Sequence, residues 1–115
     1  MPRDPGLQLE DILAAVARIR AYLQGMSYDA FRADCKTQDA VVRNLEVIGE
    51  AARALPEELK ARASNVDWRK LVGLRNLLIH EYFGISLPII CDIVTSKLDD
   101  LGLACQRLLR DLDHE

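Results

Sequence analysis

Apolar residues recur at intervals of three and four along most of this 115-residue chain. Such intervals place side chains on one face of an α-helix, because the helix completes a turn in about 3.6 residues. No segment alternates apolar and polar residues in the manner of a half-buried β-strand, and no internal repeat occurs. The sequence therefore predicts an all-α fold.

Four stretches are long enough to form main helices. Their expected apolar faces are Leu9, Ile12, Leu13, Val16, Ile19 and Leu23 in the first, Val41, Leu45, Ile48, Ala52 and Leu55 in the second, Trp68, Leu71, Val72, Leu74, Leu78, Ile79 and Tyr82 in the third, and Ile90, Ile93, Val94, Leu101, Cys105, Leu108 and Leu112 in the last. The third helix is expected to end at about Tyr82, and the last is expected to be one continuous helix.

Residue types that begin and end helices lie between these stretches. Ser27 is suited to cap a short turn that reaches Phe31, and Asp67 is suited to cap the third main helix. Pro56 ends the second main helix, and the segment PEELKARA predicts a short surface helix. We expect an antiparallel four-helix bundle with one or two short extra helices, in a single domain over residues 1–115 with its core at about 7–112.

Composition and cysteine content narrow the class of protein. A net charge of -3 and a pI near 5.4 give no general attraction to a polyanion, so any contact with nucleic acid would have to be local. Cys35, Cys91 and Cys105 lack the spacing of a zinc site and are expected to be small buried residues in a reducing compartment. Neither a signal core nor a membrane-spanning apolar run occurs, so we expect a cytoplasmic protein without metal or cofactor.

The segment LRNLLIHEYFG, from Leu74 to Gly84, places polar residues inside an otherwise apolar helix. On a helical wheel, Arg75 falls in the middle of the apolar side of the third helix. Because arginine stays protonated, its guanidinium needs a carboxylate, a path past the edge of the core, or a cleft that holds an anion. A structural ion pair with Glu46 or Glu50 is one interpretation, and an anion site is another.

Small and polar residues form a stripe on the adjoining face, namely Arg69, Gly73, Asn76 and His80. Glycine inside a helix costs about 1 kcal/mol relative to alanine, which favours a packing or functional reason for Gly73. His80 also has a structural interpretation, since a histidine near a helix C-terminus suits the helix dipole. Asn44 on the second helix could border a cleft, and the alternative for it is an N-cap-like or interhelical hydrogen bond.

An arginine and a histidine without an acidic cluster suit phosphodiester cleavage that uses no metal ion. Imidazole can take a proton from a ribose 2′-hydroxyl or deliver one to the leaving oxygen, while guanidinium neutralises charge on the phosphate oxygens. Asn76 can position the phosphate or the imidazole. Such chemistry generally uses two proton-transfer groups, so the sequence predicts a two-fold homodimer that brings Arg75 and His80 of both chains into one cleft.

The segment RNLLIHEY resembles the HEPN superfamily, and specifically the HepT family, whose signature is Arg, four residues, His, one residue, Tyr. Arg75, His80 and Tyr82 match this signature, and Asn76 follows the arginine as is common in that family. The segments MSYDAF, KTQDAVVRNLEVIGEAA, LPEELKAR and WRKLVGLRN are also similar to HepT segments and occur in the same order. The resemblance therefore covers nearly the whole chain.

The resemblance implies an all-α homodimer that acts as the toxin of a type VII-like toxin–antitoxin pair and cuts RNA, either tRNA or mRNA, without a metal ion. Arg75, Asn76 and His80 would be the catalytic residues. A nucleotidyltransferase antitoxin of the MntA type would be the partner, and it would silence the nuclease by transferring AMP from ATP to Tyr82.

Three further residues are candidates to line the cleft, namely Arg69, Gly73 and Asn44. Two other functions remain open at this point. In one, the chain is a non-catalytic helical partner of a nucleotidyltransferase, and Arg75 and His80 hold a nucleotide or substrate. In the other, it is a dimeric scaffold in which Arg75 serves only as an ion-pair partner.

Overall fold

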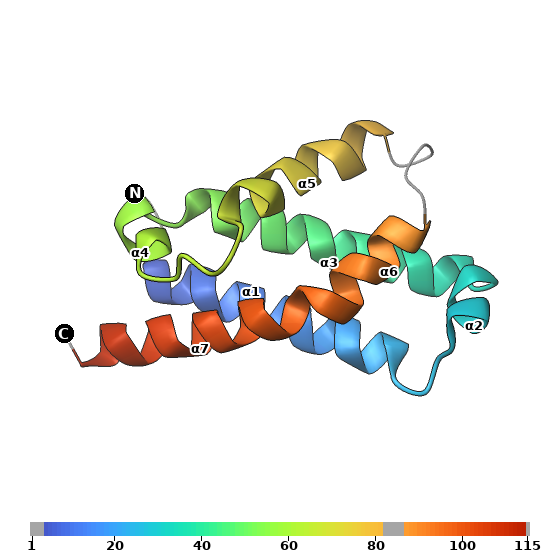
Figure 1. Cartoon of the computed structure of the whole chain (residues 1–115), viewed down its shortest axis with the longest axis horizontal. Helices are drawn as coiled ribbons and strands as arrows, with labels where there is room; N and C mark the ends of the chain where they lie inside the picture. The colour runs from blue at the N-terminus through green and yellow to red at the C-terminus, as the bar shows by residue number, and fades with distance from the viewer. Residues whose placement is uncertain (1–3, 82–86, 115) are drawn as a thin grey trace.

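The described part of the chain is almost entirely helical. The computed structural model describes residues 4–81 and 87–114, with the backbone alone at positions 75, 77 and 79–81. Its helices are α1 (Pro5–Leu23), α2 (Tyr28–Arg32), α3 (Cys35–Ala54), α4 (Glu57–Ala61), α5 (Trp68–Glu81), α6 (Leu87–Ser96) and α7 (Leu98–Asp113). These ranges contain no β-strand, so the predicted all-α class is confirmed (Figure 1).

Side-chain caps define where several helices begin. The Ser27 hydroxyl accepts a hydrogen bond from the Ala30 N–H at 3.1 Å. An Asp67 carboxylate oxygen accepts one from the Lys70 N–H, also at 3.1 Å. These bonds satisfy backbone donors that the first helical turn leaves without a partner, and they confirm both predicted caps.

Asp34 caps α3, which begins at Cys35. The Thr37 hydroxyl donates to the Asp34 carboxylate at 2.7 Å, and the Thr37 N–H donates to it at 3.0 Å. Both bonds favour the ionised carboxylate and hold the pKa of Asp34 below its ordinary value. The folded state therefore has the lower pKa, so this stabilisation is present above the unfolded pKa and is lost as the pH falls through the folded one.

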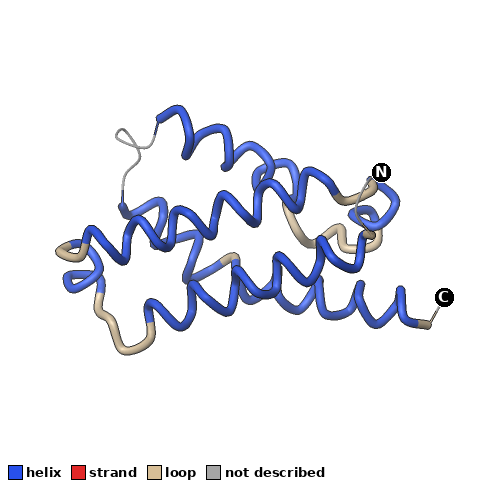
Figure 2. Tube along the Cα trace, turned by 180° about the vertical axis from the view of Figure 1, so that it is seen from behind, coloured by secondary structure: helices blue, strands red, loops and turns tan. Residues whose placement is uncertain are grey.

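The long helices run back and forth along the long axis of the molecule (Figure 1). α3 packs against both α1 and α5, and α1 also packs against α7. Seen from behind, α5 again lies at the outer edge of the array (Figure 2). A closed four-helix bundle and a homodimer remain predictions. None of the described helices combines the length and the apolar content that crossing a membrane requires.

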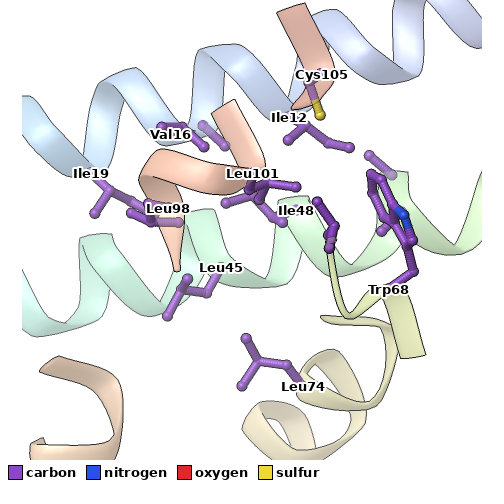
Figure 3. Packing of buried hydrophobic residues seen from close by; sticks show 14 of the residues in the cluster. Ile12, Val16, Ile19, Leu45, Ile48, Trp68, Leu74, Leu98, Leu101 and Cys105 are labelled. Atoms are coloured by element: carbon purple, nitrogen blue, oxygen red, sulfur yellow. The ribbon is translucent and has the colours of Figure 1, made fainter. Parts of the chain in front are cut away.

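The hydrophobic core lies between α1, α3 and α7 and extends to α5. Figure 3 shows side chains such as Ile12, Leu45 and Leu101 converging from three different helices. α5 adds Leu74 and Leu78, which are 8% and 1% exposed. Burial of one such side chain contributes about 1.5–3 kcal/mol, so these contacts are the main force that holds α5 on α3.

Hydrogen bonds to backbone carbonyls fix the corner that leads into α5. The Lys60 ammonium group is almost fully buried, donates to the Ala52 carbonyl at 3.2 Å and pairs with Glu57 at 3.1 Å. It thereby bonds one of the last carbonyls of α3, a position that favours a cation. The Trp68 indole N–H donates to the Ala63 carbonyl at 3.0 Å and anchors the first residue of α5.

Two expectations about helices are wrong. The last helix is not continuous, because Lys97 separates α6 from α7. Thr95 and Ser96 both donate their hydroxyls to backbone carbonyls one turn earlier, a competition that bends helices. The segment PEELKARA forms the short helix α4, but it is not only a surface element, because Leu59 and Lys60 are buried in the corner.

The expectation of three buried cysteines is also wrong. Cys35 is exposed at the first position of α3, directly after the N-cap residue Asp34. Cys91 is half-buried and Cys105 is buried. Burial disfavours the thiolate, and it raises the pKa of the Cys105 thiol to about 12.

Candidate functional site

The motif residues lie on α5, the helix at the outer edge of the array. Positions 75, 76 and 80 fall within α5, whose principal packing partner is α3 (Figure 1). Tyr82 lies outside the described residues. Leu74 and Leu78 define the buried line of α5, so the opposite side of this helix faces away from the core of its own chain.

The stripe of small and polar residues lies on that opposite side. Arg69, Gly73 and Asn76 are all exposed, and, within the described part of the chain, nothing beyond the local helix backbone lies within 4 Å of where a Cβ at Gly73 would stand. These positions are about 140° or more from Leu78 around the helix axis, at about 100° per residue. The absence of a side chain at Gly73 therefore serves no packing against the described residues of this chain, although it weakens the helix.

The two charged motif positions do not share a face of α5. Five residues separate Arg75 from His80, which corresponds to about 140° around an α-helix. Position 80 falls in register with the exposed stripe, whereas position 75 falls on the apolar side of α5, about 60° from Leu78 and about 100° or more from every position of the stripe. The two positions therefore lie on different sides of one copy of α5.

Asn44 lies on α3 and is 6% exposed. Its side-chain amide donates to the Ala40 carbonyl at 2.9 Å. That bond runs within α3, so it is of neither the N-cap nor the interhelical kind. A buried amide bonded back to its own helix has an ordinary structural role, which does not require a cleft.

The carboxylates that could pair with Arg75 lie on the helix that packs against α5. Glu46 is half-buried and Glu50 is exposed, and both belong to α3. Acidic residues that could form the predicted ion pair with Arg75 are thus present on the neighbouring helix. The Arg75 side chain lies outside the described residues, so this interpretation and the anion site both stay predictions.

One surface feature was not predicted from the sequence. A groove of about 350 Å³ lies between the end of α1, α2 and α6, and Leu23, Phe31, Cys91 and Val94 are among its lining residues. We refer to it as the α1–α6 groove. No local pattern could have indicated it, because its walls come from segments about 70 residues apart in the chain.

Comparisons with known proteins identify relatives over most of the chain. A family model described as "Ribonuclease HepT-like" matches residues 12–108. A Methanocaldococcus jannaschii protein named "Putative RNase MJ0127" is 41% identical, over 93% of this chain and 88% of its own length. "Putative RNase TTE0752" of Caldanaerobacter subterraneus subsp. tengcongensis is 34% identical, over 94% and 96% of the two chains.

"Probable ribonuclease HepT" of Thermococcus cleftensis is 36% identical, over 81% of this chain and 84% of its own. No solved structure matches the chain. The matched range begins within α1 and ends within α7, so it includes the whole of α5 and the motif positions.

Proposed function

The chain belongs to the HepT-like ribonuclease family, and from this premise we propose that it is a metal-independent endoribonuclease and the toxin of a type VII-like toxin–antitoxin pair. The observation that carries the proposal is the match of relatives named as ribonucleases along almost the whole chain, α5 included. The substrate would be RNA, either tRNA or mRNA.

The proposed site is a cleft between two copies of the chain, each an antiparallel four-helix bundle. Its support is the position of α5 at the edge of the array and the exposure of Arg69, Gly73 and Asn76 along its outer side. A two-fold axis near Gly73 would bring two copies of the motif together. His80 would lie on the seam side of α5 with Gly73, whereas position 75 is about 160° from Gly73, so the long Arg75 side chain would have to reach around the helix to the phosphate.

In the proposed reaction, the ribose 2′-oxygen attacks the adjacent phosphorus and the bond from phosphorus to the 5′-oxygen breaks. One His80 imidazole takes the proton of the 2′-hydroxyl, and the second chain's His80 gives a proton to the leaving 5′-oxygen. Arg75 neutralises the charge that grows on the non-bridging oxygens, and Asn76 positions the phosphate. The products are a 2′,3′-cyclic phosphate and a free 5′-hydroxyl.

Gly73 provides a direct test of the proposed dimer. Gly73→Ala is expected to stabilise the fold by about 0.5–1 kcal/mol, since the new methyl group meets open space and alanine is the better helix former. Gly73→Leu should keep the fold but place a bulky side chain at the seam, so sedimentation should shift from dimer to monomer. Ala17→Leu, at an exposed position of α1, is the matched control and should stay dimeric.

The dimer prediction fails if the wild-type protein sediments as a monomer at micromolar concentration and still cuts RNA. It also fails if Gly73→Leu sediments as a dimer with unchanged dissociation.

Regulation by AMP transfer has a test of its own. The Tyr82 phenol oxygen would attack the α-phosphorus of ATP, pyrophosphate would leave, and the phenolic proton would pass to a base of the antitoxin. Incubation with a cognate nucleotidyltransferase and ATP is expected to add the mass of AMP to wild type and to Tyr22→Phe and Tyr28→Phe, but not to Tyr82→Phe. Tyr22 and Tyr28 are suitable controls because both are exposed, at 39% and 42%. An adduct that persists in Tyr82→Phe would refute the assignment.

A further inference from the structure

α6 turns away from the axis of α7 at a single residue. The two views agree on this bend, which lies at Lys97 (Figures 1 and 2). The Lys97 N–H still donates to the Ile93 carbonyl at 3.0 Å, and the Leu101 N–H donates to the Lys97 carbonyl at 3.2 Å. Lys97 thus keeps helical hydrogen bonds to the residues before and after it. Nevertheless, α6 ends at Ser96 and α7 begins at Leu98, so Lys97 belongs to neither helix. No glycine or proline lies at the bend, so its cause must be sought in side chains.

Two neighbouring hydroxyls supply that cause. The Thr95 hydroxyl donates to the Cys91 carbonyl at 2.7 Å, and the Ser96 hydroxyl donates to the Asp92 carbonyl at 2.5 Å. Each bond draws a carbonyl of the last turn of α6 toward a side chain. Hydroxyls that bond back to the preceding turn bend helices and slightly destabilise them.

The bend places α6 at the α1–α6 groove, whose other lining residues lie at the end of α1, in α2 and between them. Ile90 is the one residue of α6 that is buried, at 1% exposure, although the helix is apolar over most of its circumference. Cys91 and Val94 line the α1–α6 groove together with Leu23 and Phe31. Besides Ile90, the contacts of α6 with the core come from partly buried side chains, namely Leu87, Cys91, Ile93 and Val94. Elements with few fully buried contacts open more easily than the core.

We propose that Thr95 and Ser96 form a conformational device that holds α6 bent at the α1–α6 groove, and that loss of their hydroxyl bonds releases α6 toward the axis of α7 and opens this groove. In the released state the last two helices approach one continuous helix, as the apolar periodicity of residues 90–112 favours. The proposal is independent of the nuclease function, because it concerns neither α5 nor its motif.

The three cysteines allow a direct test by thiol modification. Cys91 lines the groove, and burial raises the pKa of its thiol, so it should react slowly while α6 is seated. Cys35 is exposed and serves as the fast reference, whereas Cys105 is buried in the core and reports general unfolding. Rates at all three sites can be followed by peptide mass spectrometry during treatment of the full chain with a maleimide.

The double variant Thr95→Ala/Ser96→Ala is expected to raise the Cys91 rate about threefold to tenfold relative to Cys35, with the Cys105 rate unchanged. Both hydroxyl residues are exposed, so alanine at these positions should not disturb the fold. Thr95→Ser retains both hydroxyls and should leave the Cys91 rate at the wild-type value. Ile90→Ala removes the single buried side chain of α6 and should raise the Cys91 rate by another route.

An unchanged Cys91 rate in the double variant would overturn the proposal. A rise at Cys91 that is matched at Cys105 would overturn it as well, since it would indicate opening of the whole core rather than movement of α6. An increase confined to Cys91 in both the double variant and Ile90→Ala would support it.

Discussion

Substitution of His80 by alanine is expected to lower the rate of RNA cleavage by about 10²–10⁴-fold, the usual contribution of a positioned general acid or base. Arg75→Ala should cause a loss of about 10²–10³-fold, because it removes the cation that stabilises charge on the phosphate oxygens. The measurement is cleavage of total RNA in EDTA by purified protein, together with growth arrest after expression. Activity in EDTA is itself expected, since no step is assigned to a metal ion.

The chain provides matched controls for both variants. His114 is the other histidine and is exposed at the end of α7, and Arg110 is exposed on the same helix. His114→Ala and Arg110→Ala should therefore retain full activity. If His80→Ala or Arg75→Ala cleaves RNA and arrests growth like the wild type, the catalytic assignment is wrong. A wild-type protein that shows no cleavage in EDTA would favour the non-catalytic binding partner.

A mixed dimer of one wild-type chain and one His80→Ala chain tests whether the site is shared between chains. It retains a single His80 imidazole in the common cleft, whereas the proposed reaction uses the imidazoles of both chains. We therefore expect the mixed dimer to be as inactive as the His80→Ala homodimer. About half of the wild-type activity in a demonstrated mixed dimer would indicate that each chain carries a complete site of its own.

Much of the fold could be predicted from the sequence because its determinants are local. Ser27 and Asp67 each cap a helix by accepting a hydrogen bond from the N–H three residues later, so residue type and position suffice. The apolar spacing of the long helices likewise reports the buried face directly, as Leu74 and Leu78 illustrate on α5.

The features that were missed depend on contacts between distant segments or on competing hydrogen bonds. Lys60 is a charged residue in a segment that looks like a surface helix, and its burial follows from a carbonyl eight residues earlier at the end of α3. The bend at Lys97 follows from the hydroxyls of Thr95 and Ser96, whose effect opposes a correct apolar periodicity. Neither signal is contained in helix propensity or hydrophobic pattern.

For the candidate site, too, local features could be predicted from the sequence and contacts between distant groups could not. Residue types and spacing proposed Arg75, Asn76 and His80 as candidates and identified the stripe with Gly73, whose described members are exposed, while Tyr82 was added by the resemblance to the HepT family. The proposed convergence of these groups on one phosphate would be a property of two chains, and the sequence of one chain carries no direct measure of it.

Leu78→Ala is expected to lower the free energy of unfolding by about 2–5 kcal/mol, the usual cost of removing a buried leucine side chain together with the cavity that it leaves. Leu78 is 1% exposed and packs α5 into the core. Natural domains are stable by only about 5–15 kcal/mol, so this loss is a large fraction of the total. The measurement is chemical denaturation followed by circular dichroism. Leu103→Ala is the matched control on α7, because Leu103 is 65% exposed and its truncation should change stability by less than about 0.5 kcal/mol.

The same variant also tests whether α5 opens more easily than the other long helices. Its position at the edge of the array predicts this. Since α3 is its principal packing partner, loss of the Leu78 contact should increase amide hydrogen exchange in α5 before it does so in α1 and α3. His80 lies two residues beyond Leu78 on the same helix. Nuclease activity should therefore fall at temperatures where the core is still folded, because a positioned acid–base group loses its alignment as soon as its helix opens. If exchange in Leu78→Ala instead rises uniformly over α1, α3 and α5, then α5 unfolds only with the whole domain, and its place at the edge gives the motif no independent motion.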